Sequence, residues 1–338
     1  MEARNIFFIF ISLLFTGVGN GYSQPLSTAW AYQISGIDPV YISTFCNTQK
    51  GEVYRAGLFS GTVDLDPGIG TDSMTGQGVL FIQKFDAAGQ LMWTKSISSS
   101  AAKSLRGIAA DTDGNLLIAG TFNNLLDVDP GLNSHTLITP NPTWSNAFLL
   151  KLSPKGEFIW ADQLESEEQT EISQSALDAS GNVYNLGQIY DSVDVDPGPQ
   201  TTVLSPKGRN SDYFIRKLDP DGHLIWAKLL GSFGRYQYPY LSLGSDESIH
   251  IMGRFYDRVD FDPGPDTAYL NSATKTNFIQ KLDKNGNLKW VKSIDSISTN
   301  HLDIDNNDNI YITGAFNGTK DFDPDSSKKH MLTSYDWN

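Results

Sequence analysis

The chain has 338 residues, and its 25 Lys and Arg against 39 Asp and Glu leave a formal net charge of −14 at pH 7. Nucleic acids and anionic membrane surfaces are bound through clustered basic residues, so this charge argues against both partners. The length suits one large all-β domain or two ordinary domains, and an acidic surface favours cations, neutral sugars or peptides as partners.

Residues 1–24 have the pattern of a secretory signal peptide. Arg4 supplies a positive charge, and the apolar stretch 6–18 is followed by small and polar residues. As a helix this stretch is about 20 Å long, which is too short for the roughly 30 Å hydrocarbon core. We therefore expect cleavage near Ser23 or Gln24 and a secreted or cell-surface protein with no membrane span in residues 25–338. An uncleaved, lipid-associated helix is the alternative.

Two features recur with one period along the chain. The motif Asp-x-Asp-Pro occurs five times at spacings of 61 to 67 residues, and a tryptophan recurs at spacings of 63 to 67 residues. A shared period indicates one structural unit of about 64 residues copied five times within residues 25–338. The motifs begin at Asp64, Asp127, Asp194, Asp260 and Asp321, and the tryptophans are Trp30, Trp93, Trp160, Trp226 and Trp290.

Each unit predicts four short antiparallel strands. In one copy, the apolar segments 212–218 and 223–230 are joined by the turn residues 219–222, and segments 240–243 and 249–255 flank a second turn. A connector of about 20 residues carries the acidic motif to the next copy. Radial repetition of such units predicts an all-β fold, a β-propeller of about five four-stranded blades. A right-handed β-solenoid is the competing architecture.

The last copy is incomplete. Its inner strands are predicted at 301–305 and 310–316, and the spare strand 28–33 is expected to complete the blade and close the ring. Either residues 334–338 form a degenerate closing strand, or the chain is a fragment of a longer protein. The third-strand pattern Phe-x-x-Lys opens at Phe81, Phe148, Phe214 and Phe278, and the complete blades are predicted at 41–97, 105–164, 172–230 and 240–294.

The repeated strings carry a family resemblance. Phe-Ile-Gln-Lys-Leu-Asp-Lys-Asn-Gly-Asn-Leu-Lys-Trp at 278–290, followed by Asp-Asn-Asn-Asp-Asn-Ile-Tyr-Ile-Thr-Gly at 305–314, resembles the SBBP β-propeller repeat of secreted bacterial proteins. Matches at 178–187 and 214–226 extend the resemblance over nearly the whole mature chain. It implies a secreted or surface propeller, similar to exported Bacteroidetes proteins, with a protein or carbohydrate ligand at the cell exterior. The family has no established catalytic residues to carry over.

The paired aspartates are the sharpest candidates for a functional site. Two aspartates at i and i+2 of an extended backbone point to one side and repel, so they attract a cation, a basic partner or backbone amides. Calcium accepts several carboxylate oxygens in irregular loops, so it is the one cofactor we predict. The first interpretation of the pairs is nevertheless turn capping with ion pairs to the repeated Lys84, Lys151, Lys217 and Lys281; structural calcium and a ligand site are the alternatives. The candidate metal ligands are Asp64, Asp66, Asp127, Asp129, Asp194, Asp196, Asp260, Asp262, Asp321 and Asp323.

Other residues point to a binding or structural module. The mature chain contains no linear catalytic motif of the common hydrolase or metalloprotease types, so we do not expect an enzyme. We attribute the five repeated tryptophans to packing between blades; Trp144 and Trp337 are off this register and could contact a ligand. The prediction is a monomeric, exported binding or structural module. The alternatives are a calcium-stabilised adhesin and a polysaccharide-active lyase or hydrolase.

Overall fold

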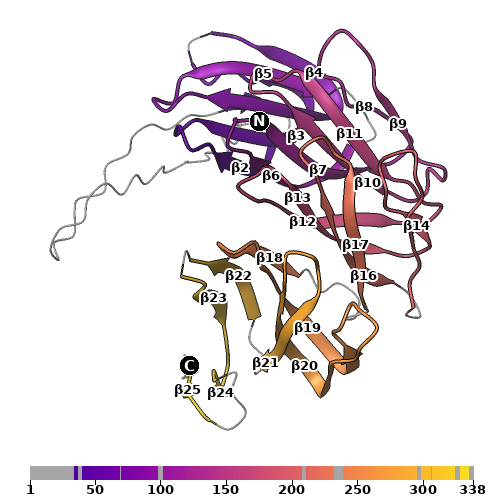
Figure 1. The fold of residues 1–338 in the computed structure, drawn as a ribbon. Coiled ribbons are helices and arrows are strands. Elements are labelled where there is room, and N and C mark those ends of the chain that lie inside the picture. The colour runs from indigo at the N-terminus through magenta and orange to yellow at the C-terminus, as the bar shows by residue number, and fades with distance from the viewer. Residues whose placement is uncertain are drawn as a thin grey trace, which may run out of the picture.

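Every regular element in the described part of the chain is a β-strand (Figure 1). This computed structural model describes residues 34–36, 40–68, 70–97, 102–207, 211–231, 239–294, 298–305, 307–323 and 328–334. The predicted signal peptide, the predicted closing strand at 28–33 and residues 335–338 lie outside these ranges.

The strands form successive antiparallel sheets, which we call blades 1 to 5. Blade 1 contains β2 (Val40–Asn47), β3 (Val53–Asp64), β4 (Ser73–Phe85) and β5 (Leu91–Ile97), and the short β1 (Ser35–Gly36) also pairs with β3. Blade 2 contains β6 (Ala102–Ala110), β7 (Leu116–Phe122), β10 (Asn146–Leu152) and β11 (Phe158–Leu164). Blade 3 contains β12 (Thr170–Leu177), β13 (Val183–Ile189), β16 (Asp212–Leu218) and β17 (Leu224–Gly231).

The later blades follow the same order, with one difference. Blade 4 contains β18 (Tyr240–Leu243), β19 (Ile249–Asp260), β20 (Tyr269–Leu282) and β21 (Leu288–Ile294). Blade 5 has two paired strands within the described residues, β22 (Ser298–Ile304) and β23 (Ile310–Ala315). Four sheets therefore have the predicted four-strand pattern, and the fifth shows its first two strands.

The connector that carries each acidic motif contains a β-hairpin. In blades 1 and 4 the second and third strands simply continue past the sheet and pair with each other. In the other blades a bend separates a short hairpin, formed by β8 (Leu125–Asp127) with β9 (Thr136–Ile138), β14 (Val193–Asp194) with β15 (Val203–Leu204), and β24 (Thr319–Asp321) with β25 (Met331–Thr333). In these three blades the hairpin strands are only two or three residues long, so they leave no clear alternation of apolar and polar residues in the sequence.

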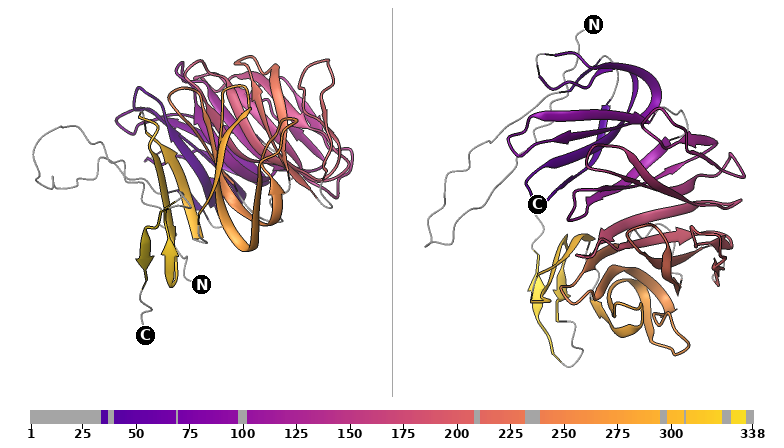
Figure 2. Two further views of the ribbon diagram at one scale, coloured as in Figure 1. Left: turned by 60° about the horizontal axis from the view of Figure 1, so that its bottom comes forward. Right: turned by 45° about the horizontal axis from the view of Figure 1, so that its top comes forward.

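The blades follow one another around an arc (Figure 2), with their first strands innermost. Strand β2 contacts β6, which contacts β12; β12 contacts β18, and β18 contacts β22. The inner strand predicted at 301–305 of the last copy overlaps β22, the last strand of this series. Apolar clusters fill the space between neighbouring blades, so the middle strands are covered on both faces and strands β7, β10, β13 and β16 are buried throughout.

The repeated tryptophans pack between blades, as predicted, at the four positions that the structure describes. Trp93 packs against the cluster between blades 1 and 2, and Trp160 against the next cluster. Trp226 and Trp290 occupy the same place in the two clusters that follow. Trp30 lies outside the described residues.

In blades 1 to 4, a glycine on the second strand lies opposite the phenylalanine of the Phe-x-x-Lys pattern on the third strand. In blade 3, Gly187 is opposite Phe214, and a Cβ on this glycine would lie 2.5 Å from the phenylalanine ring and 2.3 Å from the carbonyl oxygen of Glu171. Only a residue without a side chain lets the ring and the backbone approach so closely. The same pairs in the other blades are Gly57 with Phe81, Gly120 with Phe148, and Gly253 with Phe278.

Ile34 packs against blade 1 as an apolar residue at the end of each fourth strand packs against the blade that follows. It contacts the cluster that contains Phe59 and Phe81. Ile97 packs in the same way on blade 2, and Ile294 on blade 5. Ile34 therefore lies on the side of blade 1 where a preceding fourth strand would pack.

Candidate functional site

Each Asp-x-Asp-Pro motif lies where the second strand of a blade enters its hairpin loop. The middle residue points into the core, being buried in blades 1 to 4 and half-buried in blade 5. Because side chains alternate along an extended chain, the two flanking aspartates point to the opposite side. The middle residues are Leu65, Val128, Val195, Phe261 and Phe322.

One oxygen of the first aspartate caps the loop in all five motifs, and one oxygen of the second does so in blades 1 to 4. In blade 3, Oδ1 of Asp194 accepts hydrogen bonds from the backbone N–H groups of Asp196 at 3.1 Å and Thr202 at 2.8 Å, and Oδ1 of Asp196 accepts one from Gly198 at 2.8 Å. The first aspartate makes the equivalent pair of bonds in all five loops, and the second does so in blades 1 to 4. These contacts show turn capping. These hydrogen bonds do not test whether the ten aspartates bind calcium, so calcium binding stays a prediction.

In blades 1, 3 and 4, a buried polar side chain on the third strand donates a hydrogen bond to a backbone carbonyl of the acidic motif. Nε2 of Gln83 donates to the carbonyl of Leu65 at 2.6 Å, and Nε2 of Gln280 donates to that of Phe261 at 2.6 Å. In blade 3 the same position is Arg216, whose Nη1 donates to the carbonyl of Val195 at 2.9 Å. Sequence reasoning missed these residues, although a polar residue inside an apolar strand pattern was a usable signal.

The loops are negatively charged at neutral pH. Hydrogen bonds from the backbone N–H groups of His330 and Asp323 lower the pKa of Asp321. Partial burial raises the pKa of Asp127, but hydrogen bonds from Ser134 and the backbone of His135 outweigh this effect and lower it. Both carboxyl groups are therefore ionised well below pH 7.

The predicted partners of the repeated lysines are wrong. Lys84 contacts Glu52 at 2.9 Å, and Lys151 and Lys217 each contact the first aspartate of a turn in their own blade at 3.3 Å. Each lysine is the penultimate residue of its third strand, so about 20 Å of strand separates it from the acidic motif. The lysines and their turn carboxylates are Lys84 with Glu52, Lys151 with Asp111, Lys217 with Asp178, and Lys281 with Asp246.

Hydrogen bonds from the repeated tryptophans bring turns of neighbouring blades together. Nε1 of Trp93 donates to the carbonyl of Pro154 at 3.1 Å, in the turn between the third and fourth strands of blade 2. Trp160 donates to Pro220 of blade 3 at 3.1 Å, and Trp226 to Lys284 of blade 4 at 3.2 Å. These turns follow the third strands, whereas the acidic hairpin loops precede them. The turns of neighbouring blades therefore meet at one end of the sheets, and the acidic hairpins leave the sheets at the opposite end. We call this other end the acidic loop end, formed by the described residues 64–68, 70–72, 127–135, 194–202, 260–268, 321–323 and 328–330.

The buried His250 is expected to make the stability of the folded protein depend on pH. It is opposite Lys281 in the sheet and buried, and burial together with the Lys281 ammonium lowers its pKa to about 4. The unfolded chain, with a histidine pKa of about 6.5, takes up the proton first, so this stability is present above pH 6.5 and is lost as the pH falls toward 4.

We expect the lost stability to reach about 2 kcal/mol at pH 5 relative to pH 7.5, measured by urea unfolding. His250→Tyr should remove this part of the pH dependence. Tyrosine fits the site because Tyr54 and Tyr184 take the same position opposite lysines in blades 1 and 3. Equal pH slopes in the two proteins would contradict the assignment.

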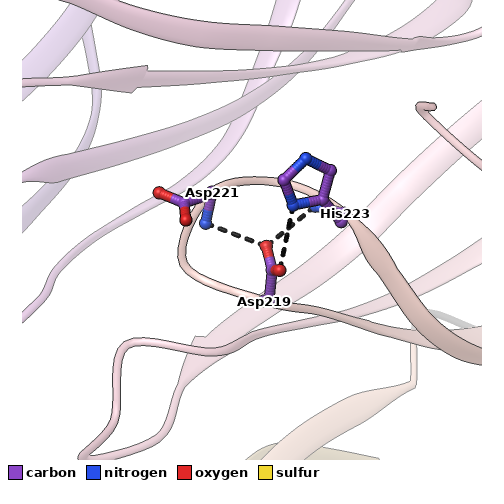
Figure 3. Close-up of side chains that lie close together, drawn as sticks. All are labelled: Asp219, Asp221 and His223. Carbon is purple, nitrogen blue, oxygen red and sulfur yellow. Dashed lines mark hydrogen bonds and ion pairs between the residues drawn. The ribbon is translucent and has the colours of Figure 1, made fainter.

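One group of three potential metal ligands lies within the described residues: Asp219, Asp221 and His223, in the turn between β16 and β17 (Figure 3). Oδ1 of Asp219 accepts from the backbone N–H groups of Asp221 and His223, both at 2.9 Å, and Oδ2 lies 3.0 Å from His223 Nδ1. This hydrogen bond raises the pKa of the exposed His223. Asp283 caps the equivalent turn of blade 4 in the same way, so the group is explained by turn chemistry.

Three further side chains bear on function. Trp144 is 40% exposed and so can reach a ligand, while Trp337 lies outside the described residues. Burial raises the pKa of the Cys46 thiol to about 12, so the thiol stays protonated at neutral pH. No helix among the described residues is long and apolar enough to cross a membrane.

Comparison with known proteins supports the fold class. The chain is similar to an uncharacterized WD repeat-containing protein of Acanthamoeba polyphaga mimivirus, with 23% identity over 239 residues, which are 63% of this chain and 17% of that protein. With the antiparallel four-stranded sheets, this similarity decides the class. The fold is a propeller-like repeat.

The match to a second relative covers a shorter part of this chain. The regulatory protein FlaEY of Caulobacter vibrioides is 26% identical over 121 residues, which are 36% of this chain and 12% of that protein. The chain thus spans less than a fifth of the length of either curated relative. No family model matches the chain.

Proposed function

We propose that this chain is an exported, monomeric β-propeller module that binds a ligand at the cell exterior, without catalysis. The propeller-like fold and the similarity to a WD repeat-containing protein support a binding or structural module. The pattern of residues 1–24 and the resemblance to SBBP repeats support export from a bacterial cell.

The acidic loop end is the site we propose for the ligand. The observation that carries this proposal is the repetition of the same capped carboxylate pair at one end of blades 1 to 4, with the first of the two caps also present in blade 5. Fixed negative charges on neighbouring loops produce a field that attracts positive groups. The ligand class that fits best is therefore a protein segment rich in lysine or arginine; a neutral carbohydrate would gain less from this charge.

Binding to a labelled peptide of alternating lysine and glycine tests this site. We expect the fourfold variant with Asn at Asp66, Asp129, Asp196 and Asp262 to bind at least about tenfold more weakly, because each asparagine keeps the capping oxygen and loses the charge. Fluorescence anisotropy at low and physiological salt measures the affinity. The control variant has Asn at four turn positions, Asp86, Asp113, Asp221 and Asp283, and it removes the same charge from the opposite end. Equal losses in both variants would show that net charge, not the loop end, binds the peptide.

Calcium-stabilised adhesion is the second candidate, favoured by the closely spaced carboxylates in each loop. If the loops bind calcium, millimolar calcium raises Tm, a chelator reverses the rise, and the loop variant with four asparagines no longer responds. Magnesium serves as the control, because it prefers a smaller octahedral site. An unchanged Tm in calcium would exclude this function for the loops.

A further inference from the structure

Three side-chain oxygens lie around one point in front of Gly244, in the turn between β18 and β19. A side chain there would begin 2.6 Å from Ser248 Oγ, 2.7 Å from Asp308 Oδ1 and 3.0 Å from Asp246 Oδ1. Asp308 belongs to the turn between β22 and β23, so the group joins two blades. We call these three oxygens the blade 4–5 oxygen cluster.

The cluster depends on an unusual turn sequence in blade 4. In blade 3 the equivalent turn opens with Asp178, whose Oδ2 accepts a hydrogen bond from Asn182 Nδ2 at 2.8 Å. Blade 4 has Gly244 and Ser248 at these two positions. Because glycine has no side chain, the serine hydroxyl has no carboxylate at the first turn position to bond with, and it faces the cluster instead.

Asp308 reaches blade 4 because its turn position faces the preceding blade. The same position in blade 3 is Gly181, where a side chain would begin 4.0 Å from Asp111 Oδ2 of blade 2. Both residues have the left-handed conformation, with φ of 60° at Asp308 and 80° at Gly181. An aspartate at this position therefore directs its carboxylate at the turn of the blade before it.

Two of the three oxygens are buried without a hydrogen bond of normal geometry. Ser248 is 3% exposed, and neither its Oγ nor Asp308 Oδ1 has a hydrogen-bond partner in the described part of the chain. Asp246 Oδ1 accepts one bond, from the backbone N–H of Ser248 at 3.0 Å. Buried oxygens without a partner cost free energy, so a bound group that accepts their lone pairs would stabilise this place.

The charges around the cluster leave one negative charge uncompensated. Asp246 and Asp308 each bring a carboxylate, and the ammonium that contacts both, Lys281 Nζ, lies 3.8 and 3.9 Å from their Oδ2 atoms. The neighbouring Glu247 is paired with Lys217 at 3.2 Å. Two carboxylates that share one distant ammonium attract a further cation.

We propose that the blade 4–5 oxygen cluster binds a small divalent cation such as magnesium, which bridges the two blades. Asp246 and Asp308 each supply a carboxylate oxygen, and Ser248 supplies its hydroxyl. Water completes the shell, since the Asp246 side chain is 55% exposed. Magnesium binds through few carboxylates and keeps several waters, whereas calcium prefers a larger set of protein oxygens. The site is separate from the Asp-x-Asp-Pro motifs.

Manganese, a paramagnetic ion that prefers the same oxygen ligands, tests the proposal on the purified chain. A bound manganese ion broadens the NMR signals of nearby amides, so the ion reports its own position. We expect selective broadening of the amides of residues 245–248 and 307–309, reversed by excess magnesium. Binding at the acidic loops would broaden the amides of those loops instead, so the two sites are distinguished. Signals at 245–248 and 307–309 that stay sharp would overturn the proposal.

Two variants with opposite expected effects test the ligands. Asp308→Asn should weaken manganese binding at these residues at least about tenfold, because asparagine tolerates the left-handed backbone but lacks the charge. The control Asp303→Asn removes the same charge from an exposed position on β22 and should bind normally. Lys281→Met should tighten binding about fivefold, since it removes a competing ammonium, and unfolding cannot imitate a gain. Equal affinity in Asp308→Asn and the wild type, or no gain in Lys281→Met, would overturn the proposal.

Discussion

Asp162→Leu is expected to destabilise the protein by about 3 to 5 kcal/mol, because it leaves the buried Arg216 guanidinium without its counter-charge. Arg216 is fully buried, and its Nη2 is ion-paired with Asp162 of the neighbouring blade 2. Its remaining contacts are neutral: Nη1 donates to the carbonyl of Val195 at 2.9 Å, and Nε to Asn185 Oδ1 at 3.3 Å. Urea unfolding of the wild type and the variant measures the loss.

The double variant Asp162→Leu with Arg216→Met tests whether the unpaired charge or the changed packing causes the loss of stability. Replacing both partners by apolar residues removes the unpaired charge, so most of the lost stability should return. The control is Lys289→Met, which breaks an exposed pair with Asp283 at 3.8 Å and should change stability by less than about 1 kcal/mol. If the double variant were less stable than Asp162→Leu, the charge would not be the cause.

Gly187→Ala is expected to cost about 3 kcal/mol, at the upper end of the range for overpacking a core. The new methyl group would meet the Glu171 carbonyl oxygen at 2.3 Å and the Phe214 ring at 2.5 Å. One obstacle is backbone and the other is a fully buried ring, so neither can move without separating β12 from β13 or displacing the third strand.

Gly107→Ala is the matched control for this prediction. Gly107 also lies in a strand, β6, but nothing lies within 4 Å of its Cβ position. Stability should therefore change by less than about 1 kcal/mol, measured in the same urea series. A similar loss in both alanine variants would show that backbone conformation, not the close approach of Phe214, makes Gly187 necessary.

Much of the fold could be predicted because each strand and turn is encoded locally. The apolar segment 212–218 and the turn that begins at Asp219 appear as expected, and the turn closes with a hydrogen bond from the Gly222 N–H to the Asp219 carbonyl at 3.1 Å. The candidate site was only partly predictable. The aspartates were found from their spacing, but their capping of loop amides eight residues ahead depends on the hairpin, whose strands are too short to give a pattern.

The amino-acid sequence by itself determined the period, the strand order within each repeat and the turns, because these depend on residues close together in the chain. Only the tertiary structure decided which groups meet across blades. Arg216 pairs with Asp162 of the preceding blade, and Trp93 bonds to a carbonyl 61 residues later in the next blade. Such contacts follow from the way neighbouring sheets stack, and no local pattern records them.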